Sequence, residues 1–466
     1  MITIICRELI DNIKNIRFIL LVLFSILLFV LNGFLFTEKF REDTEIYAVR
    51  MSADPWGSSP LTAKIHHKPN PLLFIAEGGD QYLPYQYHLI PSGNITPLLT
   101  QNRDSRLSNV FELDWAFIIR FIFSLYVILL GYHAISGEKE EGTLGLTLSN
   151  PISRLKLLVS KYLSLMITVS VPLIIGITVN LIFIQIVMPE MLSGSVIARL
   201  GFMMFSSLVF LSIFAVLSLL LSSVVHQSSL VLLILMIIWL LFNISGDITD
   251  ILTEELTPAQ SELELSQVYD TLYAPNFNAE IIKRADSGLY KTVEELEHAA
   301  AELRVDFEKR KQQLITDYNN AMFQRAKLAR NLARFSPVML FQSVSESIAG
   351  TGIQGEINFF DDIHGYFIIF TDYISKYVGD NPLLLYDTYY HVIMNFKGEM
   401  IQISTLIFAD DEQPEFDTTN FPVFQQTEPS LVHAINDALV DLSGLLLWNI
   451  VLALGAFIAF LYADVR

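Results

Sequence analysis

Six stretches of the chain are almost continuously apolar, and each is close to the ~20 residues that an α-helix needs to cross the hydrocarbon core of a bilayer. The pattern therefore predicts six membrane-spanning helices, at residues 18–36, 115–135, 162–187, 200–225, 229–245 and 444–462. The first apolar run is longer than a signal-peptide core and no Ala-x-Ala-like site follows it, so we expect it to remain as a span.

The basic residues beside these stretches indicate how the chain is oriented, because Lys and Arg in short flanking loops gather on the cytoplasmic side. These residues are Arg7, Lys14, Arg17, Lys139, Arg154, Lys156, Lys161 and Arg466. They all fall on one side if both termini are cytoplasmic, and six spans require both termini on the same side. We therefore expect a multi-pass protein of a bacterial cytoplasmic (inner) membrane with both termini inside.

This topology places two long polar segments outside. Residues 38–113 hold Pro and Gly clusters between short apolar runs, which predicts a small outer domain of mixed, loop-rich structure. Residues 247–440 are predicted to form a large, mostly helical outer domain, with its longest helix over residues 293–332, which contain neither Pro nor Gly. Pro337 marks the end of that helix, and residues 409–414 begin a polar loop. The predicted fold class is a membrane all-α protein with these two outer domains.

Composition and charge agree with this division. The chain is 52% hydrophobic and only 17% charged, yet its formal net charge is −19. Residues 247–437 hold 31 acidic and 13 basic residues, so this segment carries nearly all of the negative charge. Such a surface repels nucleic acid, which we exclude as a partner; it either keeps the domain soluble or attracts cations or basic partners. The one cysteine, Cys6, excludes an intrachain disulfide.

Little of the chain is left for the cytoplasmic side. Residues 1–17 are predicted to form an amphipathic interface helix, and residues 136–161 a loop between the second and third spans. Within the loop, the residues before Pro151 have the pattern of a short amphipathic helix with glutamates near its start, where the helix dipole favours anions. These properties alone indicate a helix that lies on the membrane surface.

The same stretch resembles a motif of a known family. It reads Glu138-Lys139-Glu140-Glu141-Gly142-Thr143-Leu144 and continues to Pro151-Ile152-Ser153-Arg154 and Lys161. This is similar to the signature of ABC type 2 permeases, in which the segment after the second span is the coupling helix that fits a cleft in a separate ATPase chain. The family commonly carries Arg or Lys where Glu141 stands. The resemblance implies an ATPase-coupling set of Glu138, Lys139, Glu140, Gly142, Thr143, Leu146, Pro151 and Arg154, in which Gly142 would allow close backbone approach and Thr143 would cap or contact the partner.

Two further places resemble a subgroup of these permeases that has a large outer domain between the fifth and sixth spans. One is Phe335-Ser336-Pro337, with Leu340-Phe341 and Ala349-Gly350-Thr351-Gly352 after it. The other is the terminal Tyr462-Ala463-Asp464-Val465-Arg466. The resemblance covers the six spans and part of the outer domain.

No motif for catalysis is present in the sequence. It contains no Gly-x-x-x-x-Gly-Lys-Ser/Thr loop, no His-Glu-x-x-His and no Gly-x-Ser-x-Gly. We therefore predict that the chain is not an enzyme and has no catalytic residue and no cofactor, so that ATP and Mg would be bound by the partner ATPase. His66-His67 and His88 could hold a metal, but exposed loop histidines are the interpretation we favour, so no metal site is predicted.

Two polar residues inside the predicted spans are candidates for lining a path, Arg120 and Asn180. Arg120 is only six residues from Asp114 at the outer boundary, so we favour a side chain that reaches the outer headgroups. For Asn180 a role in packing is an equal alternative.

The resemblance implies a permease subunit of an ATP-driven transporter, with export as its direction. Two such chains, identical or paralogous, would flank a path in the lipid bilayer, and two ATPase subunits would dock inside. A second hypothesis is an ATP-driven mechanotransmission or scaffold protein whose outer domains act on a periplasmic or envelope partner without moving a substrate. A membrane enzyme is a third, and it lacks any catalytic group.

Overall fold

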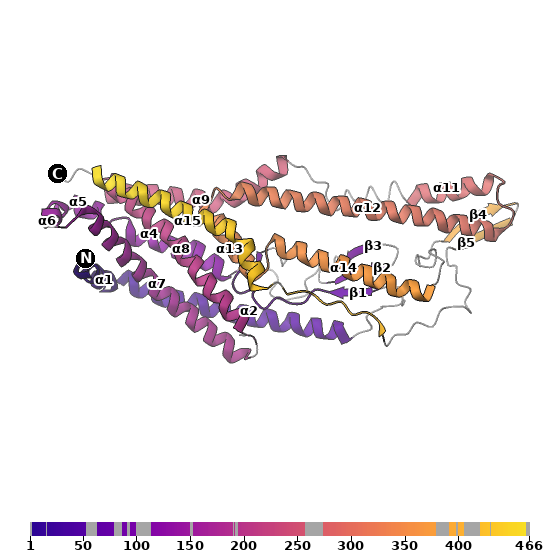
Figure 1. Ribbon diagram of the computed structural model, residues 1–466, viewed down its shortest axis with the longest axis horizontal. Helices are drawn as coiled ribbons and strands as arrows, with labels where there is room; N and C mark the ends of the chain where they lie inside the picture. The colour runs from indigo at the N-terminus through magenta and orange to yellow at the C-terminus, as the bar shows by residue number, and fades with distance from the viewer. Residues whose placement is uncertain are drawn as a thin grey trace.

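The computed structural model describes most of the chain. The described residues are 2–14, 16–52, 63–78, 86–90, 94–98, 113–149, 152–189, 191, 194–256, 274–378, 391–397, 399–404, 420–428 and 430–462. The molecule is elongated: a helical bundle occupies one end, together with both termini, and long outer helices reach to the other end (Figure 1). Pro151, residues 409–414 and the terminal residues 463–466 lie outside the described part.

Six helical stretches of the described part are long and apolar enough to cross a membrane, which confirms the predicted number of spans. They are α2 (Ile16–Ser52), the run of α3 (Trp115–Phe117), η2 (Ile118–Phe123) and α4 (Ser124–Gly131), then α7 (Arg154–Val187), α8 (Gly194–Val224), α9 (Ser228–Leu256) and α15 (Leu431–Tyr462). A preceding helix, α1 (Ile2–Lys14), lies where the interface helix was predicted.

Several helices continue well beyond the apolar limits read from the sequence. Helix α2 runs to Ser52 rather than stopping at residue 36, so the first part of segment 38–113 is helical and not loop-rich. The reason is that residues 37–52 contain no Pro or Gly, and a pair one turn apart, Glu38 and Arg41, lies 2.6 Å apart. Hydropathy marks the part of a helix that fits lipid, whereas the helix itself can continue until residues such as Pro or Gly interrupt it.

Helix α8 forms the centre of the bundle. Of its apolar window 67% is buried, against 11% for α9 and 22% for α15, so those two helices and α2 present their apolar faces outward. At the outer side of the bundle, Phe29 of α2 packs edge-on against Trp115, and Trp115 packs edge-on against Phe74. Large outward apolar faces are stable only in lipid or against another membrane helix.

Helix α13 (Pro337–Ala349) closes the end of this bundle that lies away from both termini (Figure 1). Ser336 precedes it in an extended conformation and Pro337 occupies its first turn, so the same proline that lies beyond α12 begins α13. Phe341 stacks on Phe210 of α8 with ring centroids 4.4 Å apart, and a Cβ on Gly444 of α15 would meet Leu340 at 3.0 Å. The segment is therefore packed between spans rather than free in the outer domain.

The two long outer segments share a hydrophobic core in their described parts. An antiparallel three-stranded sheet of β1 (Ala63–His66), β2 (Gln86–Ile90) and β3 (Asn94–Leu98) comes from the first segment. Ile65 and Tyr87 of this sheet pack with Phe359 and Ile363 of α14 (Ile353–Val378), which comes from the second. The two segments that the sequence separates are thus one packed unit here.

The far end of the molecule is built on α12 (Val293–Ala333), the helix predicted over residues 293–332. Helix α11 (Ala274–Asp286) and the hairpin of β4 (His391–Phe396) and β5 (Glu399–Ser404) pack at its outer end, where Leu296, Ala300 and Leu303 meet Ile281 and Phe396. Figure 1 shows α12 extending from the bundle to the end opposite both termini.

Candidate functional site

The segment singled out by the sequence lies at the bundle end that also holds both termini (Figure 1). It is not the single helix that was predicted but two short ones, α5 (Ser136–Glu140) and α6 (Thr143–Ser149). Gly142 breaks it, because its φ of +70° lies in the left-handed region that other residues avoid. A Cβ at Gly142 would meet nothing within 4 Å, so the backbone conformation, and no neighbour within this chain, favours glycine there.

The first glutamate of the segment points into the protein. Glu138 lies 2.7 Å from the ammonium nitrogen of Lys161 on α7, and Glu8 of α1 lies 2.9 Å from the same nitrogen. Lys161 is only 4% exposed. A buried ammonium group is stable only with such partners, so this lysine joins the N-terminal helix, α5 and the third span.

The next two residues contact the fourth and fifth spans. Lys139 donates a hydrogen bond to the carbonyl oxygen of Ser223, near the end of α8. Glu140 accepts hydrogen bonds from the backbone N–H (2.8 Å) and the hydroxyl (2.9 Å) of Ser228, the first residue of α9. A carboxylate at a helix N-terminus satisfies unpaired N–H groups and complements the dipole. The Glu-Lys-Glu run therefore makes contacts within the chain that join α5 to three spans.

The following residues form the face that points away from the protein. Glu141 and Gly142 are exposed, and Leu146 is 70% exposed, although Leu144 beside it is buried against Leu157 and Phe460. Leu146 lies four residues after Gly142, so the exposed part of the segment includes one large apolar side chain.

The other members of the predicted set have structural contacts. Thr143 donates a hydrogen bond to the carbonyl oxygen of Glu138 at 3.3 Å, which bridges the break between the helices. Arg154 donates to the carbonyl oxygens of Phe460 (2.8 Å) and Leu461 (2.6 Å) at the end of α15, where a cation also complements the helix dipole. Pro151 lies outside the described residues.

Arg120, whose side chain was expected to reach the outer headgroups, contacts α13 within this chain. Its guanidinium donates to the side-chain oxygen of Gln342 on α13 at 3.3 Å and lies 4.8 Å from the ring centre of Phe121. The residue sits in the π-helical turn η2, whose extra residue per turn is a common feature of functional sites. The sequence could not show this partner, because α13 is more than two hundred residues away in the chain.

A carboxyl group with a strongly shifted pKa adjoins Arg120. Gln342 also donates to Glu346 at 2.8 Å. Burial raises the pKa of Glu346 from its usual 4.5 to about 7, and the charge of Asp114 raises it further, although the hydrogen bond from Gln342 and the charges of Arg330 and Arg120 oppose this.

Asn180 is fully buried at the contact of three spans. Its amide donates to the carbonyl oxygen of Phe29 and to the side chain of Asn32 (2.9 Å), and its oxygen accepts from the indole of Trp115 at 3.2 Å. Within one chain this is a packing contact, the alternative that the sequence left open.

Sequence reasoning missed a charged cluster at the outer end of the sixth span. Asp441 of α15 is fully buried and accepts from Arg330 of α12 and from Arg334, which directly follows α12, each at 2.6 Å. It also accepts from Ser343 of α13 at 2.7 Å. The signal was available as two arginines four residues apart near the end of α12 and an aspartate just before the apolar run at residue 444.

Two of the histidines that the sequence pointed out, His66 and His67, are not exposed loop residues. His66 and His67 are both 8% exposed, and His67 packs edge-on against Phe359. Among the described residues, no three His, Cys, Asp or Glu side chains lie together in a way that could hold a metal ion.

Comparison with known proteins assigns the chain to a family. The family model described as "ABC-2 family transporter protein" matches residues 2–394. The Probable ABC transporter permease protein NosY of Pseudomonas aeruginosa is 34% identical over 109 residues, which are 23% of this chain and 40% of NosY. That relative thus aligns over less than half of either chain, whereas the family model covers most of this one. The chain belongs to the ABC-2 family of transporter proteins, whose members are membrane permease subunits that leave ATP hydrolysis to a partner chain.

Proposed function

We propose that this chain is the permease subunit of an ATP-driven exporter in a bacterial inner membrane, and that a separate ATPase docks on α5 and α6. The observation that carries the proposal is the outward face of this segment, where Glu141, Gly142 and Leu146 are exposed at the tip of the bundle. The orientation that follows places both termini inside and the outer helices in the periplasm. Two permeases, identical or paralogous, and two ATPase chains make up the complex.

The contacts of α5 supply a route for coupling. Glu138 contacts α7 through Lys161, Lys139 contacts α8, and Glu140 contacts the start of α9. A displacement of the α5–α6 segment by the ATPase is thus passed to three spans through short polar contacts rather than through flexible loops. In this account the Glu-Lys-Glu run transmits movement, and the residues after it bind the partner.

A single charge on the outward face tests the docking surface. Leu146→Asp places a carboxylate at a position of α6 that is 70% exposed, and we expect it to abolish copurification of the ATPase from membranes while leaving insertion intact. Gly142→Trp is expected to do the same. Leu289→Asp is the matched control, because Leu289 is similarly exposed, at 77% against 70% for Leu146, and lies between α11 and α12, far from α6. Normal copurification with both Leu146→Asp and Gly142→Trp would refute the assignment.

A second function is favoured by the connection between the sixth span and the outer helices. The Asp441 cluster holds α12 against α15 and α13, so a movement of α15 is passed directly to a helix of 41 residues that reaches the far end of the molecule. A chain built in this way can transmit force to an envelope partner without moving a substrate.

Reconstituted vesicles separate the two functions. The purified permease–ATPase complex is placed in vesicles with candidate substrates, and α12 carries a fluorescent label. ATP-dependent label movement together with substrate flux supports export. Label movement and ATP hydrolysis support mechanotransmission if none of the candidate substrates, which are lipids and peptides of the envelope, is transported.

A further inference from the structure

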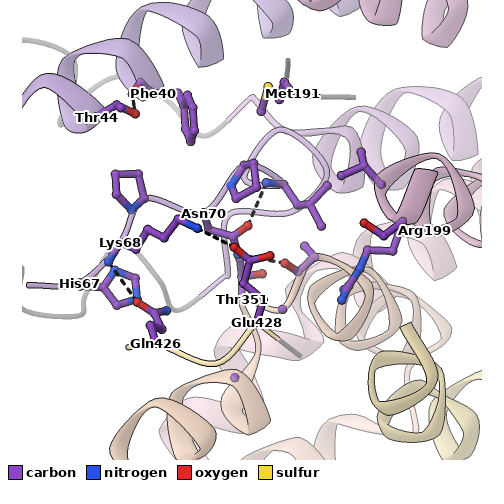
Figure 2. A pocket seen from close by; sticks show the side chains of 18 of the residues that line it. Phe40, Thr44, His67, Lys68, Asn70, Met191, Arg199, Thr351, Gln426 and Glu428 are labelled. Carbon is purple, nitrogen blue, oxygen red and sulfur yellow. Dashed lines mark hydrogen bonds and ion pairs between the residues drawn. The ribbon is translucent and has the colours of Figure 1, made fainter. Parts of the chain in front are cut away.

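A cavity of about 980 Å³ lies where the outer ends of the spans meet the outer segments. Figure 2 shows it bounded by Phe40 and Thr44 of α2, by Met191 of the turn between α7 and α8, by Arg199 of α8, and by Lys68 and Glu428 from two connecting segments. Its size is at the upper end for a small-molecule site. None of the residues assigned to ATPase docking lines it.

One wall of the cavity is apolar and belongs to the bundle. Met188 and Met191 form the turn that joins α7 to α8, and Val196 begins the buried face of α8. Ile186 and Ile197, which flank this turn, are 74% and 59% exposed, as expected of side chains that face lipid. This wall therefore stands at the outer boundary of the hydrocarbon layer.

The opposite wall is polar and carries both signs of charge. Lys68 pairs with Glu428 at 2.6 Å, and its backbone N–H donates to Gln426 at 3.0 Å, which leaves this part of the wall neutral. Beyond this pair the lining holds two cations, Arg41, which also pairs with Glu38, and Arg199, which also donates to the carbonyl oxygen of Ile348 at 2.6 Å. Its two further anions are Glu45 and Glu356. A purely anionic ligand would meet as many carboxylates as bases, whereas a ligand that carries both charges can place each beside its opposite.

We propose that this cavity binds a phospholipid of the outer leaflet with a zwitterionic head, such as a phosphoethanolamine lipid. The acyl chains lie along Met188, Met191 and Val196, the phosphate lies toward the arginines, and the ammonium group lies toward Glu45 and Glu356. This inference does not depend on ATPase docking, because it concerns the opposite end of the bundle.

Photoreactive lipids test the site in membranes that contain the full-length chain. Two diacyl probes are used, one with a phosphoethanolamine head and one with a phosphoglycerol head, each with the reactive group in an acyl chain. The phosphoethanolamine probe is expected to label the peptides that line the cavity about tenfold more than the phosphoglycerol probe does. A tenfold difference in affinity corresponds to about 1.4 kcal/mol of binding free energy.

Two variants and a control make the result specific. Thr44→Trp fills the cavity from an exposed position on α2 and is expected to reduce labelling about tenfold. Ala48→Trp, one turn further along the same helix, does not line the cavity and is expected to label as the wild type does. Glu45→Lys adds a cation to the polar wall and is expected to shift the preference toward the phosphoglycerol probe.

The outcomes are unambiguous. Labelling of the cavity that Thr44→Trp does not reduce would overturn the lipid site altogether. Equal labelling by the two probes, or a preference that Glu45→Lys leaves unchanged, would overturn the recognition of a zwitterionic head.

Discussion

At the scale of single residues, Lys161 is the side chain on which the inner end of the bundle most depends. It is 4% exposed and holds carboxylates from α1 and α5 within 3 Å. We expect Lys161→Met to leave Glu8 and Glu138 without their cation and to cost about 2 kcal/mol of stability, less than for a fully buried pair because both carboxylates are partly exposed. Thermal unfolding in detergent measures this cost.

The control for this variant is Lys156→Met, because Lys156 is an exposed lysine on the same helix. We expect its unfolding temperature to match that of the wild type. Equal losses in the two variants would show that Lys161 contributes no more than a surface charge.

Glu346 makes stability depend on pH in a direction that can be stated. Its pKa is about 7 in the folded chain and 4.5 when exposed, so the folded state binds more protons between these values. Stability contributed by the protonated form is therefore complete below about pH 4.5 and is lost as the pH rises through about 7. We expect Glu346→Gln to be more stable than the wild type at about pH 8 and little changed at about pH 4.5. The reason is that the glutamine side chain still has an oxygen to accept the hydrogen bond from Gln342 but cannot ionise.

Unfolding temperatures across this pH range check the prediction, with Glu302→Gln as the control, since Glu302 is exposed on α12. If the unfolding temperatures of Glu346→Gln and of the wild type changed with pH in parallel, the carboxyl group would have the same pKa in the folded and the unfolded chain.

At the scale of elements, hydropathy predicted what depends on local pattern and missed what depends on distant partners. The six spans and α12 follow from apolar length and from the absence of Pro and Gly, which are local properties. The break between α5 and α6 could have been predicted from Gly142, since glycine favours positive φ. The burial of α13 could not, because it rests on Phe210 and Gly444, which lie on other helices.

The sequence identified the segment that forms the candidate site but not the contacts of its side chains. The motif drew attention to residues 138–146, but a pattern of charges cannot show which of them face inward. Glu138 and Glu140 turn out to have partners at Lys161 and Ser228, far along the chain. The side chains that remain outward include Leu146, whose exposure only the fold reveals.

The Asp441 cluster connects elements that the sequence treats as separate. Removing the charge of a buried carboxylate that two arginines share leaves those arginines without their anion, which costs about 3 kcal/mol. Arg330 keeps its hydrogen bonds to Ser347 and to the backbone oxygen of Asp437, and Arg334 keeps that to Asn331. We expect Asp441→Asn to release the C-terminal end of α12 from α15, seen as faster hydrogen exchange over residues 325–333 while α8 is unchanged.

Asp437→Asn is the control, because Asp437 lies one turn earlier on α15 and only its backbone oxygen is bonded to Arg330. We expect its exchange to resemble that of the wild type. Unchanged exchange in Asp441→Asn would mean that apolar packing alone holds α12 in place.

At the scale of the whole molecule, the chain is strongly asymmetric. The end with both termini holds only α1, α5, α6 and the helix ends, whereas the opposite end holds the shared core of the outer segments and the long α12 (Figure 1). In the proposed orientation an ATPase therefore meets a small surface, and an envelope partner would meet a large one.

The one natural cysteine allows this orientation to be tested directly. Cys6 is exposed on α1, at the small end of the molecule. If that end is cytoplasmic, a membrane-impermeant maleimide will not label Cys6 in intact spheroplasts and will label it after permeabilisation. A second chain with Cys6→Ser and Lys309→Cys carries its only thiol at an exposed position of α12, and we expect it to be labelled in intact spheroplasts. The two thiols lie toward opposite ends of one elongated molecule. Labelling of both thiols or of neither in intact spheroplasts would therefore contradict the membrane position on which ATPase docking and the outer lipid site depend. The reverse pattern would place α5 and α6 outside and exclude a cytoplasmic ATPase.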